Sequence, residues 1–198
     1  MGNDFRGIAG ELDDARIALE RFSTPATAAA LERIADALAE RLLGGGKMLA
    51  CGNGGSAADA MHFCEELTGR YRDDRPSIAA IACIDPGHIT CTANDYGYEY
   101  VFSRWVEGLG RQGDALIVMS TSGNSRNMLR AIEAARVRGV LTVGLLGKGG
   151  GVMRGLCDLE IVAPGETADR VQELHMLALH TLVGGIERRL LASAGALS

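Results

Sequence analysis

Residues 49–67, LACGNGGSAADAMHFCEEL, contain the pattern that decides the fold. The stretch begins as a short apolar run, passes through a glycine-rich loop at 52–56, and continues with apolar residues at helical spacing. A helix N-terminus offers unpaired N–H groups and a partial positive charge, and glycine lets the backbone approach a ligand closely. The unit therefore predicts an anion-binding loop, followed by a helix on which His62 and Glu66 lie one turn apart.

Short apolar runs alternate with helical patterns along the rest of the chain. We expect strands over 47–51, 77–84, 114–119, 140–146 and 157–163, and helices over 8–22, 26–43, 56–69, 126–138 and 167–192. The mixed stretch 87–110 is expected to be helical around EYVFSRWVEGL (99–109). Apolar strands separated by helices are typical of a parallel sheet covered on both faces. We predict one α/β domain over 1–198 with a five-stranded, flavodoxin-like parallel sheet. Its leading helices occupy 1–45, and the sheet core and long C-terminal helix occupy 46–198.

Composition limits the possible partners. The 198 residues are 47% hydrophobic and 23% charged, as in a soluble globular protein. The net charge of −5 argues against a nucleic acid or an anionic membrane as partner. Neither a membrane span nor a signal peptide is recognisable, so we expect a cytoplasmic protein. Five scattered cysteines without a C-x-x-C pair favour small buried thiols over disulfides or a thiolate metal site.

A second candidate loop, STSGNS at 120–125, follows the apolar run LIVM. Its hydroxyls and N–H groups can surround a phosphate without Lys or Arg. The same residue types are ordinary helix caps, so a purely capping role is an alternative for either loop. Residues 52–57 also match G-x-G-x-x-A, with Asp85 near the end of the next strand, which keeps a dinucleotide-binding fold open. That alternative leaves the serine-rich loop without a ligand.

Four segments together resemble the sugar isomerase (SIS) domain family, in order and spacing, over about residues 47–185. They are CGNGGSAADAMHFCEELTGRY (51–71), ANDYGYEYVFSR (93–104), STSGNS (120–125) and ADRVQELHMLALH (168–180). The resemblance implies an aldose–ketose isomerase that converts D-sedoheptulose 7-phosphate to D-glycero-D-manno-heptose 7-phosphate, the first step towards activated heptose. It also implies a homotetramer with active sites near subunit contacts and one Zn²⁺ per active site.

The resemblance also assigns roles to individual residues. Glu66 corresponds to the catalytic base and His180 to the acid. The implied metal ligands are His62, Glu66, Gln172 and His180, a nitrogen and oxygen set that suits Zn²⁺ better than Mg²⁺. Besides Glu66 and Gln172, the implied substrate-binding residues are Asn53, Gly54, Gly55, Ser56, Asn94, Asp95, Ser120, Thr121, Ser122, Ser125 and Asp169.

Histidines on apolar helices are usually packed core residues, and His175 is expected to be one. For His180, pairing with a glutamate on another helix favours chemistry instead. Two non-enzymatic alternatives remain: a non-catalytic SIS protein, such as the relative that binds the bacterial replication initiator, and a sugar-phosphate-sensing regulator. The first lacks the acid–base pair present here, and the second usually carries a DNA-binding domain for which 198 residues leave no room.

Overall fold

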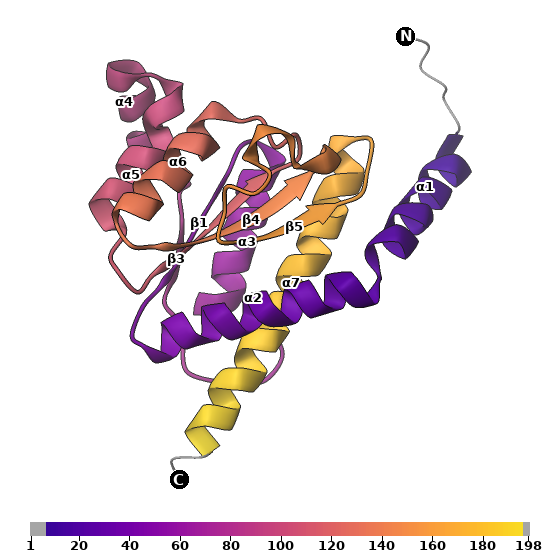
Figure 1. Ribbon diagram of the computed structural model, residues 1–198, viewed down its shortest axis with the longest axis horizontal. Helices are drawn as coiled ribbons and strands as arrows, with labels where there is room; N and C mark the ends of the chain where they lie inside the picture. Colours follow the sequence, from indigo (N-terminus) through magenta and orange to yellow (C-terminus); the bar gives the residue numbers. More distant parts are fainter. Residues whose placement is uncertain (1–6, 196–198) are drawn as a thin grey trace.

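The computed structural model describes residues 7–195 and contains the predicted five-stranded parallel sheet (Figure 1). Its strands are β1 (Met48–Gly52), β2 (Ala80–Ala82), β3 (Ala115–Ser120), β4 (Leu141–Gly147) and β5 (Leu159–Ala163). They lie in the order β2-β1-β3-β4-β5, the flavodoxin-like arrangement. Because β1 pairs directly with β3, the glycine loop after β1 and the STSGNS loop after β3 begin side by side.

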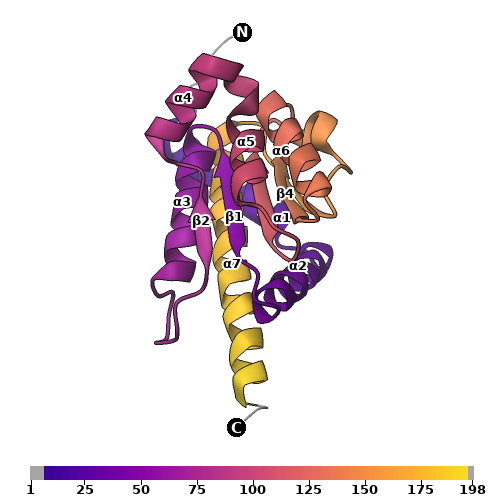
Figure 2. The ribbon, with the colours of Figure 1, turned by 90° about the vertical axis from the view of Figure 1, so that its left-hand side faces the viewer.

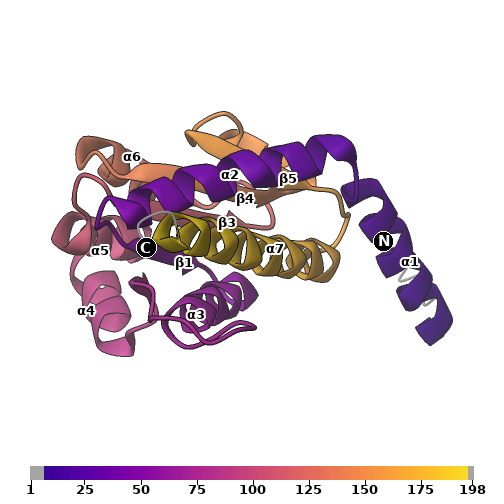
Figure 3. The ribbon, with the colours of Figure 1, turned by 90° about the horizontal axis from the view of Figure 1, so that it is seen from below.

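Helices cover both faces of the sheet. They are α1 (Gly7–Phe22), α2 (Pro25–Leu43), α3 (Gly55–Thr68), α4 (Pro86–Tyr96), α5 (Val101–Leu109), α6 (Arg126–Val137) and α7 (Ala168–Gly195), with 3-10 turns η1 (Tyr98–Tyr100) and η2 (Lys148–Met153). One core joins α2, α3 and α7 to alternate strand residues such as Met48, and the other joins α5 and α6 to the intervening residues such as Leu49. Figures 2 and 3 show α3 and α7 side by side.

Two segments differ from the sequence-based expectation. The strand expected over 77–84 is only three residues long. At its start Ser77 and Ile78 donate hydrogen bonds to carbonyls of α3, and beyond its end Asp85 caps α4 by accepting the His88 N–H at 2.6 Å. The segment 87–110 divides into two helices at Gly97, whose φ of 99° suits glycine. Residues 86–96, PGHITCTANDY, carry too few apolar residues at helical spacing for α4 to be recognised as a separate helix.

The prediction of free, buried thiols is confirmed for three cysteines and wrong for the exposed Cys91. All five thiols are free; Cys51, Cys64 and Cys83 are buried, whereas Cys157 is half-buried and Cys91 is exposed. Burial raises the pKa of Cys64 to about 12, so this thiol stays protonated and unreactive. Among the described residues, no helix is both long and apolar enough to cross a membrane.

His175 is buried in the core, as expected, with 1% of its surface exposed. Burial lowers its pKa from 6.5 to about 4, although the backbone of Leu146 acts in the opposite direction. The folded protein therefore binds fewer protons than the unfolded chain between these pH values, and its stability falls as the pH drops through this window.

We expect the His175→Met variant to lose less stability than the wild type between pH 6.5 and 4, since methionine cannot take up a proton. The difference should be on the order of 3 kcal/mol in the free energy of unfolding. Urea unfolding at a series of pH values measures it. A packing defect in the variant lowers the free energy of unfolding equally at every pH, so it leaves the slope of that free energy against pH unchanged. Equal slopes for the variant and the wild type would contradict the lowered pKa of His175.

Candidate active site

The two loops at the carboxyl edge of the sheet lead into helices whose N-termini no side chain caps. The α3 N-cap, Gly54, has no side chain, and the α6 N-cap, Ser125, makes no capping hydrogen bond. By contrast, Thr24 caps α2 and Asp85 caps α4. The purely capping interpretation is therefore wrong for these two loops. The dinucleotide alternative is weakened too, because Oδ1 of Asp85, its proposed ribose ligand, accepts the His88 N–H and caps α4.

The cradle, residues 120–125, is folded tightly by its own hydroxyls. Ser120 Oγ lies 3.3 Å from Ser125 Oγ and accepts the Gly123 N–H at 3.0 Å. Ser122 Oγ accepts the Asn124 N–H at 3.2 Å. Gly123 has a φ of 64° and packs against the Gly150 backbone so closely that a Cβ would clash. The structure thus gathers all the predicted cradle hydroxyls, including half-buried Thr121, around one loop without a cationic side chain.

The first loop, residues 52–56, is fastened to the helix that follows the cradle. Asn53 and Asn127 exchange two amide hydrogen bonds, of 3.0 and 2.8 Å, and Tyr98 Oη donates to Asn53 Oδ1 at 2.8 Å. Gly54 and Gly55 are exposed at the loop mouth, whereas Ser56 is only 3% exposed. Asn127 and Tyr98 were not predicted as site residues; the bonds they make set the orientation of the Asn53 amide.

The seam between α3 and α7 brings together His62, Glu66 and His180. Nε2 of His62 lies 3.0 Å from Nε2 of His180 and 3.4 Å from Oε1 of Glu66. One ligand atom from each of the three side chains falls within 4.8 Å of the others, and all three residues are half-buried. Two imidazole nitrogens and a carboxylate that converge in this way form a donor set that fits Zn²⁺.

Two further side chains hold the histidines of the seam. Glu65 places Oε2 3.3 Å from Nδ1 of His62, and such a contact favours a proton on Nδ1 and leaves the Nε2 lone pair available. The Tyr71 ring stacks on His180, with centroids 5.8 Å apart and planes inclined by 24°. Neither residue was predicted to belong to the site, although both fall within the segment that carries the family resemblance.

Asp59, one turn before His62 on α3, is a further group that the sequence patterns did not identify. The residue is 9% exposed, and burial raises the pKa of its carboxyl to about 6 while the His62 charge lowers it. Besides Glu65 and Glu66, a third carboxyl therefore lies beside the seam.

The remaining predicted residues occupy the surroundings of these groups. The Gln172 amide lies against Gly55, where a Cβ would clash with it, so α7 reaches the first loop. Asp169 lies in the first turn of α7, where hydrogen bonds from Thr167 and Arg170 lower its pKa to about 2 and keep it ionised.

Asn94 and Asp95 are exposed near the end of α4 and bond to each other, Asn94 Nδ2 donating to Asp95 Oδ1 at 2.8 Å. In the described part of the chain, the side-chain hydrogen bonds of this pair go to each other and to Cys91, and none goes to the cradle or the seam. The nearby link is Tyr98, which reaches Asn53 from the turn just after α4.

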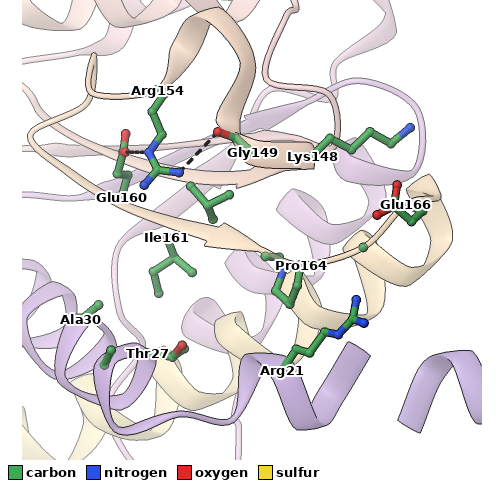
Figure 4. Close-up of a pocket in the computed structure, with 14 residues that line it drawn as sticks. Arg21, Thr27, Ala30, Lys148, Gly149, Arg154, Glu160, Ile161, Pro164 and Glu166 are labelled. Atoms are coloured by element: carbon green, nitrogen blue, oxygen red, sulfur yellow. Dashed lines mark hydrogen bonds and ion pairs between the residues drawn. The ribbon is translucent and has the colours of Figure 1, made fainter. Parts of the chain in front are cut away.

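A separate cavity of about 740 Å³ lies between α2, β5 and η2 (Figure 4). None of the predicted site residues lines it. Arg154 forms an ion pair with Glu160 at 3.2 Å and donates to the Gly149 carbonyl at 3.3 Å, so its charge is already compensated. The cavity is thus distinct from the candidate active site at the carboxyl edge.

Sequence comparison identifies the class of protein. A family model described as the SIS domain matches residues 12–147, and the chain belongs to this family.

The phosphoheptose isomerase of Fusobacterium nucleatum is 55% identical over 157 residues, which cover 79% of this chain and 81% of the relative. That of Tolumonas auensis is 52% identical over 185 residues, covering 92% and 96%. The structure of the phosphoheptose isomerase from Neisseria gonorrhoeae superposes with a TM-score of 0.85 at 36% identity, covering 91% of this chain and 97% of that one. Within the SIS family the chain therefore groups with the phosphoheptose isomerases, which are enzymes.

We expect Ser125→Ala to weaken substrate binding more than catalysis. A hydroxyl that donates to a phosphate contributes roughly 1.5–3 kcal/mol, so KM should rise about tenfold or more while kcat changes less. Steady-state kinetics measures both. Ser103→Ala, which removes one hydroxyl from α5, is the matched control. A collapse of kcat at unchanged KM would mean that the cradle takes part in the chemistry.

Proposed function

We propose that the protein converts D-sedoheptulose 7-phosphate to D-glycero-D-manno-heptose 7-phosphate, the step that leads towards activated heptose. The observation that carries the proposal is the seam, where a carboxylate and an imidazole from two different helices converge at 3.0–3.4 Å around His62. The relatives named phosphoheptose isomerase support the substrate class.

Aldose–ketose isomerisation requires a proton to move between C1 and C2 of the sugar. In the proposed mechanism, the Glu66 carboxylate takes a proton from C1 of the ketose, and the released electron pair forms the C1–C2 double bond. His180 gives a proton to the C2 oxygen, which completes the enediol. Glu66 then returns the carbon proton to C2 and His180 takes the O1 proton, which produces the aldose and restores both groups to their starting states. Only 15% of the Glu66 side chain is exposed, so the base is sheltered from competing water.

The phosphate is held at a distance from this chemistry. In the proposal, the hydroxyls of Ser120, Thr121, Ser122 and Ser125 and the uncapped N-terminus of α6 bind it. Asn53, Gly54, Gly55 and Ser56 of the first loop, together with Asn94, Asp95, Asp169 and Gln172, contribute contacts to the sugar.

We also propose one Zn²⁺ per active site, held by His62, Glu66, Gln172 and His180. The convergence of three of these side chains within 4.8 Å supports it, and Glu65 orients His62 as neighbouring carboxylates orient metal-binding histidines. A bound zinc ion supplies Lewis acidity that polarises the sugar carbonyl.

A cytoplasmic homotetramer is the assembly that we propose. Helix α1 extends away from the sheet (Figures 1 and 3) and buries only Ala18 and Phe22. Its Ile8 and Leu12 are 83% and 69% exposed, an apolar face that a second copy of the chain would cover.

We expect Glu66→Gln and His180→Gln each to lower kcat at least about a hundredfold, because general acid–base residues typically contribute 10²–10⁴ in rate. The rate of aldose formation from sedoheptulose 7-phosphate measures turnover. Glu133→Gln, on α6, is the control variant. The substrate should still raise the Tm of both variants, since the cradle is intact.

Near-wild-type turnover by Glu66→Gln would refute the mechanism. Wild-type protein that binds the sugar phosphate without converting it would instead support a non-catalytic SIS protein.

Purified protein should contain about one zinc ion per active site, and a strong chelator should lower activity that Zn²⁺ restores. His62→Ala should lose metal because it removes one converging nitrogen, whereas His88→Ala should not, because its ring bonds the Val101 carbonyl on another helix. Elemental analysis of the purified wild-type and variant proteins measures their zinc content. Full activity of metal-free protein would remove zinc from the mechanism and leave the acid–base pair in place.

A further inference from the structure

A buried ion pair joins the segment after α3 to α7. Arg75 Nε donates to Glu187 Oε1 at 2.7 Å, and the two side chains are only 4% and 9% exposed. A charge pair so sheltered is costly to form and strongly destabilising to break, so its geometry is tightly determined.

The remaining donors of Arg75 bind the carboxyl end of α3. Nη2 donates to the Glu66 carbonyl at 2.7 Å, and Nη1 donates to the carbonyls of Leu67 at 2.8 Å and Gly69 at 3.3 Å. These carbonyls include ones that have no partner inside the helix, and the positive charge complements the negative end of the helix dipole. A planar guanidinium reaches this set and Glu187 together, which a lysine ammonium cannot do.

The contact joins the backbone of the proposed base to the helix that carries the proposed acid. Arg75 holds the backbone of Glu66 itself. Glu187 follows His180 by seven residues, about two turns, and so lies on the same face of α7. The guanidinium therefore bridges the same two helices that bring His62 and His180 within 3.0 Å.

We propose that Arg75 and Glu187 form a positioning clamp, which sets the separation of α3 and α7 and thereby places Glu66 against His180. Neither residue touches the substrate. The proposal rests on the roles given above to Glu66 and His180. It differs from a merely stabilising ion pair because it predicts a loss of kcat in protein that is fully folded.

The main test is the kinetics of Arg75→Lys with sedoheptulose 7-phosphate, well below its Tm. We expect kcat to fall about 10- to 100-fold, as for a displacement of reacting groups by about 1 Å, with KM changing much less because the cradle is untouched. Glu187→Gln, which keeps an acceptor for Arg75, should retain more activity than Glu187→Ala.

A matched control separates positioning from stability. Asp114→Ala breaks another sheltered ion pair, with the partly exposed Lys47, which lies at the amino ends of β1 and β3 and does not join α3 to α7. It should lower the Tm comparably and leave kcat unchanged. If Arg75→Lys and Asp114→Ala lower Tm alike and both keep wild-type kcat, the clamp is refuted. Inactive wild-type protein would instead refute the proposed function.

A double variant tests whether the clamp acts through the base. Once Glu66→Gln has removed the base, adding Arg75→Lys should slow the remaining turnover little further, because effects on one catalytic unit are not additive. If the loss of kcat in the double variant equals the product of the two single losses, Arg75 acts independently of Glu66, and the proposal is overturned.

Discussion

The candidate active site depends on how closely α3 and α7 approach each other. Apolar residues of the two helices, including Phe63 and Leu179, share one core under the sheet and hold the helices together. Gly55 permits the approach at the loop end, since any side chain there would collide with Gln172. At the other end, Arg75 ties α3 to Glu187. Between these two points the imidazoles of His62 and His180 come within 3.0 Å.

The cradle and the seam are positioned by different kinds of interaction. Its donors belong to one short loop and to the first turn of α6, so local backbone conformation places them, and Gly123 supplies the left-handed φ that the turn requires. The seam is built from side chains on separate helices and depends on tertiary packing. Asn127 connects the two regions because it belongs to the first turn of α6 and bonds Asn53 of the loop that opens α3.

This difference explains what the sequence could predict. The positions of the strands along the chain, both loops and the His62–Glu66 pair follow from local patterns, because apolar runs, glycines and helical spacing are local properties. Asn127, Tyr98 and Arg75 were missed because their contacts join residues 74, 45 and 112 positions apart. Helix α4 was missed because its start depends on a cap and a proline more than on apolar spacing. Glu65 and Tyr71 lay within recognised segments, but only the contacts reveal their function.

The distribution of charge across the site adds a reason for the substrate to bind in one direction. The seam gathers the carboxyl groups of Asp59, Glu65 and Glu66, whereas the cradle contains hydroxyls, backbone N–H groups and a helix N-terminus. The N–H groups, hydroxyls and helix N-terminus of the cradle stabilise a phosphate dianion, whereas the carboxylates of the seam suit a cation such as the proposed Zn²⁺. This division of charge supports the proposed orientation of the substrate, in which the phosphate lies in the cradle and the uncharged C1–C2 end reaches Glu66.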